Sequence, residues 1–341
     1  MSSRMERVSR HGLWRAAAVT VVVIAVGIGS LVAAKWWVGR GGSGGQADVP
    51  DAVAGPGPAG PTKPVSFHGV EVLVPRSWPL NAVRCGTPVR DTVVVGLGAV
   101  AACMILPQPV VSVVELKPVR DAEVSKQAAV ADRAVRVDGH GGRRGEDRLQ
   151  DGRTRVVLLL PDLDAAVVAE SKDPALARSV VASARVARID AAGCPDRVRE
   201  LRPPGSPQRD GAARLTVPGT PVAGAVCRYS DLRLARSAAL TSSQLQRLEA
   251  LLNAAPVGTS RPGDGYAISP ALCGEEERRG FVARFRYASG PPLEVVVHIG
   301  GCGPLGASNG ARGVRLSPEL IATLTDLVGY DGGYPDPAQL R

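Results

Sequence analysis

The sequence predicts a membrane-anchored α+β protein with one N-terminal transmembrane helix, a flexible linker and two small disulfide-stapled α+β domains. Three observations lead to this fold class. An uncharged run of nineteen residues lies near the N-terminus, and a stretch rich in glycine and proline follows it. The rest of the chain mixes alternating apolar segments with short helical patterns and contains six cysteines.

Residues 16–34 carry no charge and, at about 1.5 Å per residue, are long enough to cross a bilayer. Arginines precede this run, and Lys35 and two tryptophans follow it. The positive-inside rule therefore makes residues 1–15 a cytoplasmic arm and residues 16–38 a single-pass cell-membrane helix, with everything beyond it extracellular. A cleaved signal peptide ending near Ala34 is the alternative, and it also exports the rest of the chain.

Residues 39–64 are almost free of large apolar side chains and should form a Gly/Pro-rich linker. We expect one extracytoplasmic α+β domain over residues 65–190 and a second over residues 191–330, with residues 331–341 as a tail. The stretch LRPPGSPQRDGAARL marks the boundary between the two domains.

In the first domain, valines alternate in GVEVLVP, which predicts a strand ending at Pro75. Asp173 and Pro174 are typical of a helix start, and the helix should run to about Ala184. Residues 121–137 could contain a short helix, and residues 138–153 read as a polar loop or hairpin tip. Further strands are expected over residues 91–95, 110–116, 155–160 and 165–169.

In the second domain, AVCRYSDLRLARSAAL predicts one or two strands, and TSSQ has the spacing of a capping box ahead of a leucine-rich helix. GFVARFRYA and LEVVVHI should form a hairpin whose first strand places its aromatic residues on one face. Ser317 and Pro318 should begin the last helix.

The six cysteines all lie in the exported part of the chain, where disulfides are the expected state. Six cysteines allow 15 pairings, and the sequence cannot choose among them. We favour pairing of nearest neighbours, because two of the pairs then bracket coherent predicted elements. These pairs are Cys85 with Cys103, Cys194 with Cys227, and Cys273 with Cys302. A metal site is disfavoured, since there is no C-x-x-C and the exported histidines are scattered.

Residues 298–310, HIGGCGPLGASNG, contain a G-x-G-x-x-G pattern after a predicted strand. A dinucleotide-binding loop opens directly into a helix, whereas this chain stays irregular up to Ser317. Asp326 would be the ribose-binding acid, but it falls inside a predicted helix. We therefore interpret the pattern as a glycine-rich turn that carries Cys302, and no cofactor is expected.

A cell-envelope hydrolase could be built from His298, Ser308 and either Asp231 or Asp264. No G-x-S-x-G turn supports it, so this stays the second hypothesis, and we do not expect an enzyme. The carboxylates at residues 275–277 are followed at once by two arginines, which is typical of a solvated turn.

The net charge is +9 at pH 7, of which residues 1–15 contribute +3. A basic exported surface suits an anionic cell-wall partner, although a solvated surface explains it equally well. Arg284 and Arg286 could form such a basic face opposite Phe281 and Phe285. Nucleic acid is not expected as a partner, because the few aromatic residues are not interleaved with the arginines.

In its general plan, and in the stretches SWPLNAVRCGTP and AVCRYSDLRL, the chain resembles membrane-tethered exported proteins of unknown function from high-GC Gram-positive bacteria. That resemblance implies no activity and no site residues. The sequence thus predicts a non-catalytic interaction module of the cell envelope that binds a protein or wall component.

Overall fold

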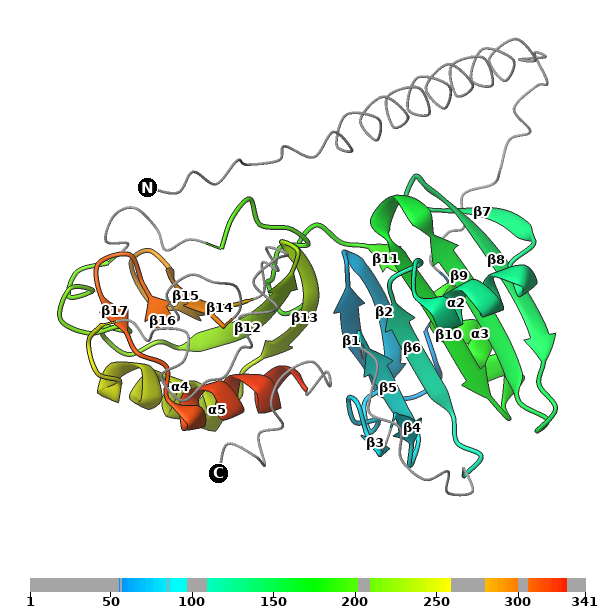
Figure 1. Ribbon diagram of the computed structural model, residues 1–341, viewed down its shortest axis with the longest axis horizontal. Coiled ribbons are helices and arrows are strands. Elements are labelled where there is room, and N and C mark those ends of the chain that lie inside the picture. Colours follow the sequence, from blue (N-terminus) through cyan, green and yellow to red (C-terminus); the bar gives the residue numbers. More distant parts are fainter. Residues whose placement is uncertain are drawn as a thin grey trace, which may run out of the picture. The chain divides into compact units, whose positions relative to one another are not determined.

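The structure, a computed structural model, describes Gly55 and residues 57–84, 86–96, 109–201, 209–258, 280–299 and 306–329. Within these residues the protein is mixed α+β, rich in strands and with few helices, as the sequence predicts (Figure 1). None of the helices in this part is long and apolar enough to cross a bilayer. The predicted membrane segment, residues 16–38, lies outside the described residues. We call residues 57–187 the first half and residues 188–329 the second half.

The first half begins with a small antiparallel sheet of three strands in the order β1-β2-β11. Its strands are β1 (Thr62–Phe67), β2 (Val70–Pro75) and β11 (Arg185–Val186). Strand β1 starts at Thr62, so the linker predicted over residues 39–64 extends too far at its C-terminal end. This strand was not predicted from the sequence because Pro64 interrupts it. Proline is tolerated in strands chiefly at sheet edges. Strand β1 occupies such an edge.

A six-stranded sheet, in the order β5-β6-β10-β9-β8-β7, forms the larger part of the first half. Strands β5 and β6 run parallel and the other neighbours are antiparallel. Its strands are β5 (Thr92–Val95), β6 (Val113–Lys117), β7 (Arg133–Val137), β8 (His140–Arg148), β9 (Thr154–Leu160) and β10 (Ala165–Ser171). Strands β3 (Val83–Arg84) and β4 (Thr87–Pro88) form a separate short hairpin.

Both faces of the six-stranded sheet are covered. On one face, the small sheet and helix α3 (Pro174–Ala182) enclose a valine-rich core. On the other face lie α2 (Ala122–Gln127) and the 3-10 turn η1 (Ala128–Val130), over a smaller core that includes Val124 and Leu159. A second 3-10 turn, η2 (Pro161–Leu163), joins β9 to β10. The side chain of Asp173 accepts a hydrogen bond from the Ala175 amide at 2.9 Å, which confirms the predicted start of α3.

Strand β8 replaces the predicted polar loop or hairpin tip of residues 138–153. Asp138 and Gly139, both with positive φ, form the two-residue turn before β8, and residues 149–153 form the turn after it. This strand was not predicted because its residues, mainly arginines, glycines and acids, show no alternation of apolar and polar side chains. Its glycine at 145 is required by packing, since a Cβ there would lie 1.7 Å from the Val130 carbonyl oxygen.

The second half is built on one antiparallel six-stranded sheet in the order β13-β12-β14-β15-β16-β17. Its strands are β12 (Ala223–Ser230), β13 (Arg233–Ala239), β14 (Gly280–Arg286), β15 (Leu293–His298), β16 (Gly306–Ser308) and β17 (Gly313–Val314). Helices α4 (Ser242–Ala254) and α5 (Pro318–Val328) cover one face (Figure 1). The capping box of Thr241 and Gln244 and the Ser317 cap form as predicted.

The other face of this sheet is covered by irregular chain that includes Cys194 and Leu201. Cys194 is bonded to Cys227 of β12, with a Cα–Cα distance of 5.6 Å and a separation of 33 residues. This confirms one of the three expected disulfides. The other four cysteines, Cys85, Cys103, Cys273 and Cys302, lie outside the described residues.

Candidate functional site

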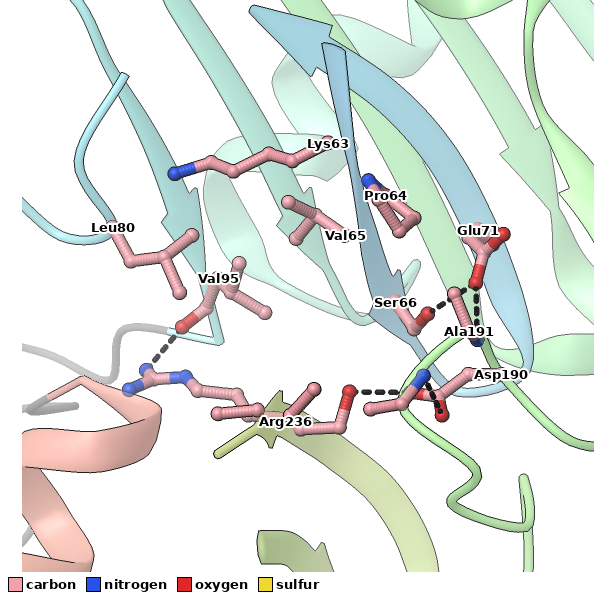
Figure 2. A pocket seen from close by; sticks show the side chains of 14 residues that line it. Lys63, Pro64, Val65, Ser66, Glu71, Leu80, Val95, Asp190, Ala191 and Arg236 are labelled. Carbon is pink, nitrogen blue, oxygen red and sulfur yellow. Dashed lines mark hydrogen bonds between the residues drawn. The ribbon is translucent and has the colours of Figure 1, made fainter. Parts of the chain in front are cut away.

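A cavity of about 320 Å³ lies between the first half and the second half, and it is the candidate site (Figure 2). Strand β1 supplies one wall and strand β13 another, and the chain around Asp190 lies between them. Leu80 and Val95 close one end. Most of the lining is apolar and small, with alanines at positions 191, 192, 238 and 239.

Glu71 is a buried carboxylate in this lining, only 1% exposed. Its oxygens accept hydrogen bonds from the Ser66 hydroxyl at 3.2 Å, the Ala191 amide at 2.9 Å and Arg185 Nε at 2.8 Å. Glu71 thereby ties strands β1 and β11 to the chain that begins the second half. It is a structural carboxylate whose bonding capacity is already used.

Asp190 is the second buried carboxylate of the lining. One oxygen accepts hydrogen bonds from the Ala192 amide at 3.0 Å and the Cys194 amide at 2.8 Å, and the other accepts from the Ser237 hydroxyl. The Asp190 side chain thus shapes the turn that leads into the disulfide, and the disulfide fixes that turn on β12. This wall of the cavity is held at both ends.

Two cations lie toward the opposite end, as Figure 2 shows for Lys63 and Arg236. Lys63 donates to the carbonyl of Trp78, and burial lowers the pKa of its ammonium group. Arg236 donates to the carbonyls of Val95 and Gly329, so it links β5 to the end of α5. A cation is favourable at a helix C-terminus because the free carbonyls carry partial negative charge.

Strand β1 presents a free edge to the cavity. Phe67 and Val70 flank the two-residue turn of the β1–β2 hairpin and therefore form a hydrogen-bonded pair. Bonding alternates along an antiparallel pair, so Ser66 directs its N–H and C=O away from β2. These two groups have no backbone partner among the described residues.

Strand β13 presents a second free edge. The Leu240 amide donates to the Gly224 carbonyl at 2.9 Å, so by alternation Ala239 and Ser237 direct their backbone groups away from β12. Neither has a backbone partner in the part of the chain that the structure describes.

One hydrogen bond joins the two free edges within the described residues, from the His68 amide to the Leu234 carbonyl at 2.7 Å. The amide of Leu234 is used as well, by the Asp196 carbonyl at 2.8 Å. Beyond this junction, residues of both β1 and β13 line the cavity. Chemically, the site offers unused backbone donors and acceptors, small apolar walls and two cations. Such a surface can bind an extended peptide by strand addition.

The hydrolase residues are only partly brought together. His298 pairs with Gly306, and Ser308 pairs with Val296, so His298 and Ser308 are diagonal neighbours on β15 and β16. Burial lowers the pKa of His298, and a hydrogen bond with the backbone of Leu201 opposes this shift.

The other members of the hydrolase hypothesis lie elsewhere. The Ser308 hydroxyl accepts from the Gly310 amide at 3.1 Å. Asp231 sits in the turn between β12 and β13, 3.9 Å from Arg120. Asp264 lies outside the described residues.

Several other sequence features also fall outside the described residues, namely residues 275–279 and the glycine pattern at 301–305. Of the expected basic face, Arg284 pairs with Glu294 at 3.0 Å and also donates to the Gly193 carbonyl, whereas Arg286 is exposed. In the described ranges, no three metal-ligating side chains lie together.

The cavity was not predicted from the sequence, but two local signals of its buried carboxylates were present. Glu71 stands between buried valines in β2, and a carboxylate at such a position needs partners if both faces of the strand are buried. Asp190 lies two and four residues before amides that it binds, which is typical of an Asx turn. Nothing in the sequence indicated that the two would meet.

Searches of protein-family models, curated proteins and solved structures found no match to this chain.

Proposed function

We propose that this protein is a membrane-anchored, extracytoplasmic binding module of the cell envelope, and that the cavity between β1 and β13 binds an extended peptide segment of a partner protein. The observation that carries this proposal is the pair of free strand edges lining one cavity. An extended peptide satisfies its own backbone groups by pairing with such an edge, and side-chain pockets then give specificity.

The shape of the lining supports a peptide as the ligand. The alanines at positions 191 and 239 leave room for side chains of a bound strand, and both are exposed. The two buried carboxylates accept hydrogen bonds from neighbouring side chains and amides, so they shape the walls of the cavity. The cation Lys63 could receive a carboxylate of the peptide.

The location of the module follows from the N-terminal sequence and from the disulfide. The uncharged residues 16–34 suit a single-pass helix whose N-terminus is cytoplasmic. The Cys194–Cys227 bond suits an oxidising, extracytoplasmic compartment. We include in this proposal the pairing of Cys85 with Cys103 and of Cys273 with Cys302, and a two-domain arrangement on a short stalk.

The peptide proposal can be tested with the full-length protein in detergent and a displayed library of random heptapeptides. Selected peptides should bind the wild type and should crosslink from a photoreactive residue placed at Ala191. Replacing Ala239 by proline removes an N–H that points away from β12, so the β12–β13 ladder is left intact. We expect affinity to fall about tenfold, because one ligand carbonyl then loses its donor.

The matched control is Ala239→Ser, which keeps the N–H and should bind within about twofold of the wild type. Melting temperatures of both variants show whether the fold is retained. Peptides that bind equally well to Ala239→Pro, or that crosslink only outside the cavity, would contradict the proposal. So would a library that yields no binder.

A further inference from the structure

The β7–β8 hairpin carries an unbalanced set of arginines at the edge of the first half's large sheet. Four of them are exposed and one is half-buried. None of the five makes a hydrogen bond or ion pair through its side chain within the described residues. They are Arg133, Arg136, Arg143, Arg144 and Arg148.

The acids of the same hairpin do not neutralise these arginines, because each is engaged by another element. Glu146 accepts two hydrogen bonds from Arg178 Nε and one from Nη2, at 2.7 to 3.2 Å. Asp147 accepts from Arg155 Nε at 2.9 Å, and Asp138 accepts from the Val186 amide at 2.6 Å. Because side chains alternate along a strand, the register places Arg133, Arg144 and Arg148 on one face of the hairpin and Arg136 and Arg143 on the other. The face with three arginines therefore carries a net positive charge.

Two of these arginines face each other across the hairpin. Arg133 and Arg144 are directly opposite in the register, an arrangement that costs free energy for like charges. Burial lowers the pKa of the Arg144 guanidinium, and the nearby Arg133 and Arg178 lower it further, whereas the charge of Glu146 acts in the opposite direction. An anion between the two guanidinium groups would remove this repulsion.

The chain enters the fold beside this surface. The Gly55 amide donates to the Ala182 carbonyl at 2.7 Å, at the C-terminal end of α3. Ala182 and Arg144 line the same small hollow of about 50 Å³. Gly55, the first residue that the structure describes, therefore lies beside the hollow that Arg144 lines.

We propose that the β7–β8 hairpin docks onto the anionic lipid headgroups of the membrane in which the chain is anchored. This inference rests on the anchored location proposed above and is independent of the peptide cleft. Charge complementarity and the nearby point of chain entry favour a membrane surface over a soluble partner. A tethered body meets its own membrane at high effective concentration, and each arginine near an anionic surface strengthens binding about fivefold.

The experiment uses the full chain in nanodiscs of phosphatidylcholine, with or without about one third phosphatidylglycerol, and measures backbone hydrogen exchange. Ala134 and Arg136 are informative, because alternation from the Val137–His140 pair directs their amides away from β8. We expect exchange over residues 133–137 to slow at least fivefold with phosphatidylglycerol, and the slowing to disappear near 1 M salt, where screening is strong.

The double variant Arg133→Gln and Arg144→Gln should lose this protection. A matched control, Arg199→Gln with Arg214→Gln, removes the same charge from exposed sites in the second half and should keep it. Equal exchange in the two lipids would overturn the proposal. So would protection by added soluble polyphosphate without protection by phosphatidylglycerol. Labelling that finds the C-terminus cytoplasmic would instead overturn the extracytoplasmic location, and the peptide selection is unaffected by either result.

Discussion

Both faces of each large sheet in this protein are covered, but the two sheets differ in what covers the second face. Each has one face covered by a large apolar core, which in the first half includes α3 and in the second half α4 and α5. The remaining face of the first sheet is covered by α2 and η1, over aliphatic residues. The remaining face of the second sheet is covered by irregular chain held by the Cys194–Cys227 bond.

The second face of the second sheet shows which interactions are needed when irregular chain, in place of helices, covers a sheet. A helix pairs its interior backbone groups itself, and at the start of the short α2 the Asp121 carboxylate accepts from the Val124 amide at 3.4 Å. Irregular chain must find partners for its amides and must lose more conformational freedom. In the second half, Asp190 provides the hydrogen bonds and the disulfide provides the constraint. The candidate cleft is built on this fixed segment.

The largest expected effect is on the disulfide. Replacing Cys194 and Cys227 by alanine should lower the free energy of unfolding by about 4 kcal/mol, because the bond closes a loop with a sequence separation of 33 residues. Denaturant unfolding of the full chain in detergent measures this loss. The first sheet should unfold later than the second in the variant.

Addition of reductant to the wild type is the control for the packing change that alanine causes. Because reductant also opens the proposed Cys85–Cys103 and Cys273–Cys302 bonds, its loss should be at least as large as that of the double variant. Unfolding that is insensitive to both the double substitution and reductant would remove the contrast between the two faces.

The second prediction concerns the helical cover of the first sheet. Gly145→Ala should destabilise the protein by about 3 kcal/mol, because its Cβ would meet the Val130 carbonyl oxygen at 1.7 Å and push η1 off the sheet. Gly141→Ala is the matched control in the same strand, since nothing lies within 4 Å of its Cβ. Thermal melting of both variants tests the difference. Similar melting temperatures would show that the cover adapts to the added methyl group.

The third prediction concerns the buried carboxylate of the second half. Asp190→Ala leaves the amides of Ala192 and Cys194 without their acceptor and should cost about 2 kcal/mol. Asp190→Asn keeps an acceptor oxygen and should cost about half as much. Unfolding by denaturant distinguishes them. If the two variants are equally stable, the charge of Asp190 matters more than the hydrogen bonds assigned to it.

Much of the local structure was predictable because its signals lie within a few residues. The capping box at Thr241, the Asp173 cap and the alternating valines of β2 are examples. Strands β1 and β8 were not predicted, since a proline interrupts one and arginines and glycines fill the other. These strands depend on sheet neighbours, which local patterns do not encode.

The candidate site was much less predictable. Lys63 and Ala239 both line the cavity although they are far apart in the sequence, and they meet only because two sheet edges join at His68 and Leu234. Pairing of nearest neighbours predicted the Cys194–Cys227 bond correctly, but the full set of three pairs is one choice among 15. The sequence predicted a polar loop or hairpin tip for the arginines of β8, and only the register places Arg144 opposite Arg133.

The smallest expected effect is a pH dependence at the junction of the two halves. Burial lowers the pKa of His68, as do the nearby Arg233 and Arg120, whereas Asp164 acts in the opposite direction through its carbonyl and its charge. The folded state therefore favours the neutral ring. Below about pH 6.5 the unfolded chain binds a proton at this histidine, whereas the folded chain does not until the pH reaches its lowered pKa. The free energy of unfolding therefore falls with pH over this interval.

His68→Asn should make the free energy of unfolding less dependent on pH between about 7 and 5. The slope should change by at most the contribution of one proton, which is about 1.4 kcal/mol per pH unit. Asparagine suits the site because His68 has a φ of 51°. The same two proteins at about pH 8, where an ordinary histidine is neutral, are the control, because their difference there reflects the substitution alone. Denaturant midpoints across this range provide the measurement. A wild-type slope retained in His68→Asn would place the titrating group elsewhere, with His298 the next to test because burial lowers its pKa too.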